Sequence, residues 1–384
     1  MSMFSAALVA SLVGFGSTIA LVLAAAQAVG ATPAEAASWV AAVSIAKGLA
    51  SGWLSLRHRM PIVLAWSTPG AALIAATQGI ALPEAAGAFI AAGLMIAATG
   101  LIAPLGRMIA AIPAPIAAAM LAGVLLPFTM DVARFAVDDW AIVLPLAAVF
   151  VVVRTWSPLY AAIAALLTGL ALGAHLAPTA FDTSRLAFDA LPIVLVTPVF
   201  DPAIVIGLAV PLYLVTMASQ NLPGFAVLRA NGYEPPVSSA LTVTGLGSAA
   251  IGFFGAHPFN MAAITAAICL GPDVHQDPQR RWRVGLWYAA IWVGLGLAST
   301  IVVPVILAMP RAIIAVVAGL ALIGPLMGAA EAAFREPETR FAATVAFAVT
   351  ASGMAVLGIG AAFWGLATGL LLRGVDRVTR RRGS

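Results

Sequence analysis

Charged residues and cysteines are scarce in this 384-residue sequence, where 9% of the residues are charged and Cys269 is the one cysteine. A soluble globular domain carries about 25% charged residues. A chain that is 62% hydrophobic also has more apolar surface than a soluble fold of this size can bury. One cysteine excludes both an intrachain disulfide and a cysteine metal site. The composition therefore predicts a polytopic protein of the lipid bilayer.

The sequence also lacks the motifs of an enzyme or of an ATP-driven pump. It contains no Gly-Lys-Ser/Thr phosphate-binding motif. Its apolar segments hold no cluster of Asp, Glu, His or Ser with a base, which membrane-embedded catalysis would need. The net charge of +4 arises in short loops and the C-terminal tail, which is a pattern of membrane topology and not of nucleic-acid binding. We therefore expect no enzyme activity, no cofactor, no metal and no nucleic-acid partner.

What the sequence does contain is a series of about fourteen apolar segments, and a spanning helix needs about 17–25 mostly apolar residues. The expected spans are 5–29, 34–56, 62–80, 84–104, 110–128, 139–154, 157–175, 202–219, 236–253, 254–270, 284–308, 311–332, 339–357 and 359–373. The first segment is too long for a signal-peptide core and follows no basic region, so we interpret it as a retained span.

Basic residues are distributed unevenly between the two sides of the membrane. With a cytoplasmic N-terminus and fourteen spans, most of them lie in cytoplasmic loops and in the tail, whereas Arg134, Arg185 and Arg311 lie outside. This bias predicts a bacterial-type inner-membrane protein with both termini in the cytoplasm. Lys47 alone falls in the interior of an expected span, away from its ends. It could snorkel to the inner interface, pair with a polar group or contact a substrate, and its role stays open.

The two halves of the chain resemble each other. The string Leu-Thr-Gly-Leu-Ala-Leu that begins at Leu167 resembles Ala-Thr-Gly-Leu-Leu-Leu, which begins 200 residues later at Ala367, and Pro69 in the third segment corresponds to Pro258 in the tenth. Seven spans in each half is an odd number, so the second half would be inverted, as in secondary transporters with alternating access. We therefore predict an all-α polytopic membrane protein with two inverted repeats, residues 1–190 (spans 1–7) and 200–384 (spans 8–14).

The third and tenth segments carry a proline near their start with polar residues beside it. Proline fits the first turn of a helix, so Pro69 and Pro258 are each expected to begin a half-helix near the membrane centre, after the extended residues 64–66 and 254–256. The positive ends of the two half-helices would face each other and form an anion site. The alternative is that both prolines merely kink ordinary spans.

The side chains next to these prolines are candidates for the site. Ser67 and Thr68 would cap the first half-helix, and His257 would cap the second, with Asn260 one turn further in. His257 is the one histidine expected at membrane depth. It is either a functional ionisable group or a neutral helix cap.

Further candidates lie in the first, third and eighth segments. Gln220 and Asn221 could donate hydrogen bonds to a carboxylate or tie the eighth span to its neighbours. Gln27 could face the same cavity, and Trp66 could stack on an aromatic substrate or pack in the core. The full set of expected substrate-binding residues is Gln27, Trp66, Ser67, Thr68, Pro69, Gly70, Ser219, Gln220, Asn221, His257, Pro258, Phe259 and Asn260.

Three stretches resemble the BenE benzoate/proton symporter family. They are Thr216–Gly224, Ala65–Ala72, and Asn260–Cys269 with the Gly-Pro-Asp that starts at Gly271. The resemblance runs nearly end to end and implies a fourteen-span fold similar to that of uracil permeases. It implies a core domain (spans 1–4 and 8–11, about 5–104 and 202–308) that moves against a gate domain (spans 5–7 and 12–14, about 110–175 and 311–373). The substrate would then lie between the two broken spans.

Relatives with the uracil-permease fold place acidic residues on spans eight and ten, but residues 217–221 and 260–263 of this sequence hold none. This departure suits an anionic substrate, because two buried carboxylates that face each other repel strongly. It leaves His257 or the substrate itself as the proton carrier. We expect proton-coupled uptake of benzoate or a similar aromatic carboxylate. The alternatives are another small organic anion, a nucleobase, or a channel, and a homodimer is one possible assembly.

Overall fold

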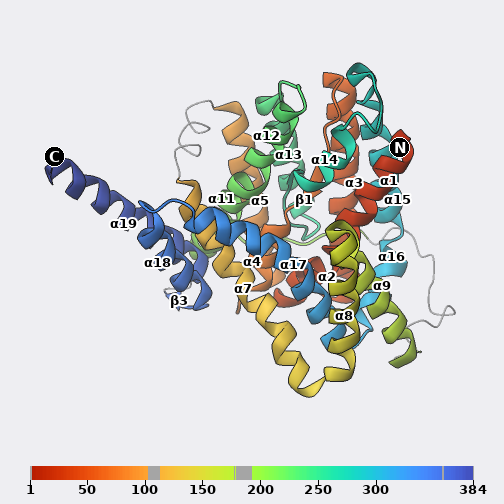
Figure 1. The fold of residues 1–384 in the computed structure, drawn as a ribbon, viewed down its shortest axis with the longest axis horizontal. Coiled ribbons are helices and arrows are strands. Elements are labelled where there is room, and N and C mark those ends of the chain that lie inside the picture. The colour runs from red at the N-terminus through yellow and green to blue at the C-terminus, as the bar shows by residue number, and fades with distance from the viewer. Residues whose placement is uncertain (1, 103–112, 177, 179–192, 357–358, 384) are drawn as a thin grey trace.

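The computed structural model describes residues 2–102, 113–176, 178, 193–356 and 359–383 (Figure 1). These residues are mostly helical, with two small two-stranded sheets. The elements of the first half are α1 (Met3–Gly16), α2 (Ile19–Ala28), α3 (Pro33–His58), β1 (Leu64–Trp66), α4 (Thr68–Ala75), α5 (Leu82–Leu101), α7 (Ala114–Asp138), α8 (Trp140–Trp156) and α9 (Pro158–Leu176).

The second half is also mostly helical and contains three short strands. Its elements are α10 (Pro202–Ile204), η3 (Val205–Ala209), α11 (Val210–Thr216), η4 (Met217–Asn221), α12 (Leu222–Ala230), α13 (Val237–Gly252), β2 (Phe259–Met261), α14 (Ile264–Leu270), η5 (Pro278–Arg280), α15 (Arg283–Leu297), α16 (Ser299–Leu307), α17 (Arg311–Phe334), α18 (Arg340–Ala351), β3 (Ala355–Val356), β4 (Ile359–Gly360) and α19 (Ala361–Gly383). Helix α19 carries the C-terminal end of the chain away from the helical body (Figure 1).

Six helical segments of the described chain are long and apolar enough to cross a membrane. A seventh span would join the segment that ends in α15 to α16, which meet at a bend of 57°. Four further apolar helices have 10–17 residues. The expected first span is present as α1 and α2. The expected total of about fourteen spans also counts the broken segments and the shorter helices, and it stays a prediction, as do the inverted repeats.

Local sequence signals explain where several helices begin. Thr32 and Glu35 form a capping box at the start of α3: the Thr32 hydroxyl accepts from the Glu35 N–H at 3.3 Å, and the Glu35 carboxylate accepts from the Thr32 N–H at 2.8 Å. Pro33 occupies the first turn, where its missing N–H costs nothing. Gly30, in the turn before this cap, has a φ of 74°, which glycine adopts without strain.

Residues 202–230 form one helical segment that contains two π-helical stretches, η3 and η4. Each stretch is followed two residues later by a proline, Pro211 or Pro223, which cannot donate a hydrogen bond to the preceding turn. We expected the eighth span to end just before Gln220. That boundary is wrong because the helix continues, so Gln220 and Asn221 lie inside it, in η4.

The third segment is broken as predicted. Residues Leu64–Trp66 form β1, Ser67 is the N-cap, and α4 begins at Thr68 with Pro69 in its first turn. An extended strand followed by a short helix therefore replaces a continuous span here, and the kinked-helix alternative is wrong for this segment.

The prediction for the tenth segment is wrong in register. Residues 254–256 are not the extended stretch: the chain turns there at Gly255, which has a φ of 70°. Pro258 does not begin a helix either, because residues Phe259–Met261 form β2 and pair with β1. Pairing with β1 satisfies the backbone of β2 inside the protein, so the helix starts only at Ile264. His257 is consequently not a helix cap, and Asn260 lies in the strand.

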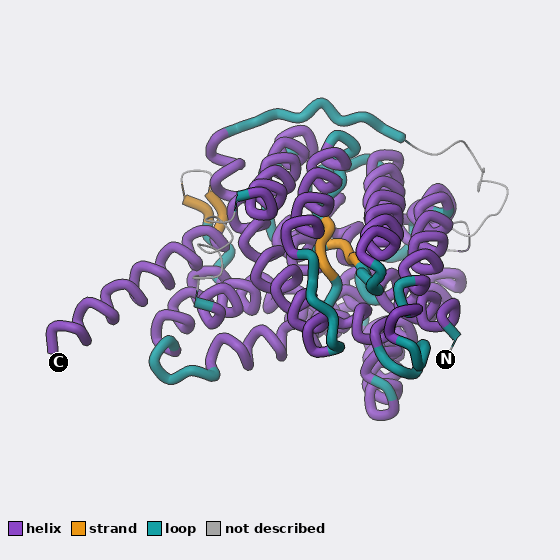
Figure 2. Tube along the Cα trace, turned by 90° about the horizontal axis from the view of Figure 1, so that it is seen from above, coloured by secondary structure: helices purple, strands orange, loops and turns teal. Residues whose placement is uncertain are grey.

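The long helices pack closely through small residues. Helix α3 packs on α15 and α5 packs on α13, whereas α7 packs on α17 and α18 and α8 packs on α9. At the first of these contacts a Cβ on Gly52 would lie 2.9 Å from the Cβ of Ala289. Close approach of small residues is a common basis of helix association in lipid, where van der Waals contact replaces the hydrophobic effect. Figure 2 shows the β1–β2 pair enclosed by these helices.

Candidate functional site

The β1–β2 pair joins the two broken segments at the centre of the molecule. The strands are antiparallel, with Leu64 opposite Met261 and Trp66 opposite Phe259. The Ser67 N–H donates to the Pro258 carbonyl at 3.1 Å and extends the pairing by one residue. Because these bonds satisfy non-helical backbone inside the protein, a broken segment can persist at membrane depth.

Helix α4 begins against the eighth span. The Ser67 hydroxyl accepts from the Gly70 N–H at 3.2 Å, and it lies 2.8 Å from the Thr216 hydroxyl. A Cβ on Gly70 would lie 2.6 Å from Leu212 Cδ1 and 2.7 Å from the Ser67 hydroxyl oxygen. Glycine at this position thus allows the start of α4 to sit directly on α11.

A cavity of about 670 Å³ opens beside these strands. One wall comes from α1, α3, β1, α4, η4, the start of α14, and α15, and the opposite wall comes from α7, α8, α9 and α17. The first wall contributes Val13, Gly14, Ser17, Thr18, Lys47, Ala65, Trp66, Thr68, Pro69, Gln220, Ala262, Ala263, Thr265, Tyr288 and Trp292. The second wall contributes Leu125, Phe150, Arg154, Pro158, Ala162, Ala321, Gly324, Pro325, Met327 and Gly328.

The cavity combines an apolar, aromatic lining with positive charge. Two basic side chains, Lys47 and Arg154, line it, and none of the described lining residues is acidic. Gln220 and the hydroxyls of Thr68 and Thr265 are among the polar groups of the lining. A small molecule with an apolar body and a negative charge fits this combination better than a cation does.

Lys47 lies in an aromatic cage. Its ammonium nitrogen is 2.8 Å from the ring centroid of Trp292 and 4.6 Å from that of Trp66. The two indole rings pack edge to face with centroids 5.2 Å apart, and Phe15 contacts both of them. The lysine is fully buried, and its ammonium nitrogen has no hydrogen-bond partner among the described residues. When the amine is protonated, the ring faces attract it by a cation–π interaction.

Four of the expected site residues line the cavity: Trp66, Thr68, Pro69 and Gln220. Of the nine others, seven lie behind the cavity wall, and Ser219 and Gln27 lie elsewhere. Behind the cavity wall lie Ser67, Gly70, Asn221, His257, Pro258, Phe259 and Asn260, all buried. Ser219 is half-buried in η4 and does not line the cavity.

Asn221 and Asn260 hold the eighth span against β2. The Asn221 side-chain carbonyl accepts from the Met261 N–H at 2.9 Å. The Asn260 amide donates to the Met261 carbonyl at 2.7 Å and to the Gln220 side-chain carbonyl at 3.5 Å. Of the two roles considered for Asn221, these contacts match the one in which it ties the eighth span to a neighbour. Asn260 instead orients Gln220 at the cavity wall.

His257 packs inside the wall. Its Nδ1 accepts a hydrogen bond from the Trp39 indole N–H at 2.7 Å, and the two rings lie 5.6 Å apart. An accepting Nδ1 places the proton of the neutral ring on Nε2. The side chain is fully buried and does not line the cavity.

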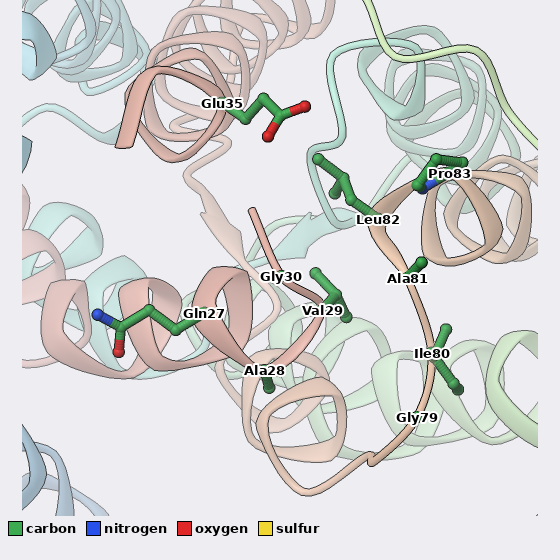
Figure 3. A pocket seen from close by; sticks show the side chains of 10 residues that line it. All are labelled: Gln27, Ala28, Val29, Gly30, Glu35, Gly79, Ile80, Ala81, Leu82 and Pro83. Carbon is green, nitrogen blue, oxygen red and sulfur yellow. The ribbon is translucent and has the colours of Figure 1, made fainter. Parts of the chain in front are cut away.

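Gln27 lies at a different pocket. This pocket of about 510 Å³ is formed by the end of α2, the start of α3 and the loop that leads into α5 (Figure 3). Gln27 is exposed there and is not among the residues that line the central cavity. Gln27 lies in the last turn of α2, and this turn borders the second pocket and not the cavity beside β1. Its position in the sequence alone did not show this.

The structure adds cavity residues that the sequence reasoning missed. Tyr288, Trp292 and Arg154 are distant in sequence from both prolines, and no motif marks them. Thr265 follows Pro258 by seven residues and lies in the stretch Asn260–Cys269, but it was not among the expected site residues. Lys47 did carry a signal, since it is the one basic residue in the interior of an expected span, away from the span ends, and such residues are functional candidates by default.

Comparison with known proteins gives consistent matches over the whole chain. A sequence model of the family described as benzoate membrane transport protein matches residues 1–375. The chain is 38% identical over 365 residues to the inner membrane protein YdcO of Escherichia coli (strain K12), covering 95% of this chain and 93% of that protein. It is 31% identical over 374 residues to the benzoate membrane transport protein of Acinetobacter baylyi, with the same coverage of both chains.

Solved structures share the fold at low sequence identity. The transmembrane domain of the cyanobacterial bicarbonate transporter BicA aligns with a TM-score of 0.60 at 15% identity, covering 96% of each chain. SLC26A9 aligns with a TM-score of 0.64 at 13% identity, covering 98% of this chain and 65% of the other. These matches establish an architecture that membrane transporters use.

Proposed function

This chain belongs to the family of benzoate membrane transport proteins, and we propose that it takes up benzoate or a similar aromatic carboxylate by proton-coupled symport across the inner membrane. Its family and relatives are membrane transport proteins and not enzymes. The observation that carries the proposal is the central cavity, in which aromatic rings and basic side chains occur together and no described lining residue is acidic.

Both parts of an aromatic carboxylate, its ring and its charged group, match the lining of the cavity. The ring of the substrate would lie against Trp66 and Phe150, from opposite walls. The carboxylate would face Lys47, the Thr68 hydroxyl at the first turn of α4 and the Gln220 amide. The positive end of the α4 dipole adds to this attraction.

The position of the cavity suits alternating access. Its two walls come from the residues expected to form the core domain and from those expected to form the gate domain. In our proposal two inverted repeats of seven spans build these domains, and movement of one domain against the other exposes the cavity to each side in turn. The arginine bias supports our proposal that both termini lie in the cytoplasm.

Two other substrate classes, small organic anions and nucleobases, match the lining of the cavity to different degrees. Another small organic anion would use the same cations and stays the alternative. A nucleobase presents ring N–H groups that need acceptors, and the described lining offers no carboxylate. The nucleobase alternative is therefore weaker than the organic anion.

The test is uptake of radiolabelled benzoate into liposomes that contain the purified protein, with and without an inward proton gradient. We expect accumulation above empty liposomes that collapses when a protonophore is added. Empty liposomes correct for benzoic acid that crosses lipid unaided. Uptake no greater than in empty liposomes would refute benzoate as the substrate, and a panel of aliphatic carboxylates and nucleobases would then be tested in the same vesicles.

A further inference from the structure

The proposed function does not explain how the charge of the buried Lys47 is balanced. Lys47 is fully buried beside Trp66 and Trp292, lines the cavity, and has no hydrogen-bond partner among the described residues. Burying a lone ammonium ion away from water is costly unless an opposite charge lies beside it. The aromatic faces supply part of that compensation, but they carry no net negative charge.

The surroundings of Lys47 offer no protein carboxylate as a counter-ion. The charged or titratable groups on α3, and on the described elements packed against it, are Glu35, Arg57 and His58 at the ends of α3, and Arg283 and Tyr288 on α15. Glu35 lies twelve positions before Lys47 in the helix, about 18 Å away along the axis. It is also engaged in the capping box with Thr32.

None of the other ionisable groups described near the cavity, Tyr288, His257 and Arg154, is a carboxylate. The Tyr288 hydroxyl donates to the Leu64 carbonyl at 2.7 Å. The Nδ1 of His257 accepts from Trp39. Arg154, on the opposite wall, is a second cation and contacts the sulfur of Met327 at 3.4 Å. The substrate's own carboxylate is thus the negative charge that can enter next to Lys47.

We propose that Lys47 is the proton carrier of this transporter, neutral when the cavity is empty and protonated when a carboxylate binds beside it. The inference rests on the proposed function. Entry of one substrate anion and one proton converts the lysine amine to an ammonium ion paired with the carboxylate. Release on the other side returns the amine, so each cycle moves one proton with one anion and no net charge.

The experiment compares two activities of the same proteoliposomes. Exchange of external labelled benzoate for internal benzoate needs binding and movement of the loaded carrier only. Gradient-driven accumulation also needs the empty carrier to return without its proton. In Lys47→Arg the side chain keeps its positive charge, since a guanidinium does not deprotonate in proteins. We expect this variant to retain exchange and to lose gradient-driven accumulation.

A matched control and a second variant make the result specific. Arg57→Gln removes an exposed cation from the same helix, outside the cavity, and is expected to retain both activities. Lys47→Met keeps the length of the side chain without a charge, and it is expected to lose gradient-driven accumulation as well. Size-exclusion profiles in detergent show whether each variant is folded.

A measurement on the unchanged protein tests the charge balance without any variant. At a constant proton gradient, a potassium diffusion potential set with valinomycin should not change the rate of benzoate accumulation. A rate that depends on the potential would overturn the proposal, and so would gradient-driven accumulation by Lys47→Arg equal to that of the unchanged protein. Loss of accumulation in His257→Gln but not in Lys47→Arg would assign the proton to His257. Failure of the unchanged protein to exchange benzoate would instead refute the proposed function.

Discussion

Gln220 brings an amide to the cavity wall from a π-helical turn. Its side-chain carbonyl is engaged by the Asn260 amide at 3.5 Å, so its own NH₂ group is the part that remains for a ligand. Single π-helical turns inside longer helices often occur at functional sites, because they redirect one side chain without ending the helix. Gln220 is therefore the neutral side chain that we expect to orient the substrate carboxylate.

Replacing this amide gives a prediction at the scale of one residue. Gln220→Ala should raise the KM for benzoate about tenfold or more, since a hydrogen bond to a charged group contributes about 1.5–3 kcal/mol. The concentration dependence of uptake in proteoliposomes measures this. Gln78→Ala, which truncates an exposed glutamine outside the cavity, serves as the control. A KM equal to that of the unchanged protein would remove Gln220 from the binding site.

The element that matters most for the site is the break between β1 and α4. A continuous helix here would fill the centre of the molecule, whereas the strand exposes the first turn of α4 to the cavity. The arrangement depends on a close contact between α4 and α11 at Gly70, where even one additional carbon atom meets Leu212 and the capping hydroxyl of Ser67.

A glycine substitution tests this element. Gly70→Ala should destabilise the protein by about 1–3 kcal/mol, because the new methyl group overpacks the contact with α11. Thermal unfolding in detergent reports the loss, and uptake should fall with it because the start of α4 is displaced. Gly294→Ala is the matched control, since a Cβ there has no other atom within 4 Å. Equal unfolding temperatures for both variants would show that the contact is loose.

On the scale of the whole molecule, two groups of helices face each other across one cavity. Helices α3, α5, α13 and α15 pack among themselves, as do α7, α8, α9 and α17, and the cavity lies between the groups. The grouping supports the proposed division into a core and a gate. Their movement relative to each other is what alternating access requires.

Membrane orientation is a prediction at this same scale. Cysteines introduced by Asp138→Cys and Glu234→Cys lie at exposed positions, and the single native Cys269 is buried, so background labelling should be low. A membrane-impermeant thiol reagent should label Asp138→Cys in intact cells and Glu234→Cys only after permeabilisation. The reverse pattern would invert the proposed topology.

The sequence alone determined that the chain lies in a membrane and that the third segment is broken. The composition indicates that lipid surrounds much of the protein, because so apolar a chain would expose too much apolar surface to water. Pro69, with Ser67 before it, marks a helix start by local rules of capping, and the structure has that start. The three stretches that resemble a transporter family likewise identified the family that the whole-chain comparison shows.

Tertiary structure decided the contents of the site. Pro258 looked equivalent to Pro69, but pairing with β1 draws the following residues into a strand and moves the second helix start to Ile264. His257 is consequently held against Trp39 in the wall, while Lys47 faces the cavity between two tryptophans from other elements. Local signals specify where a helix can begin, but pairing and packing between distant segments decide which side chains meet in a cavity.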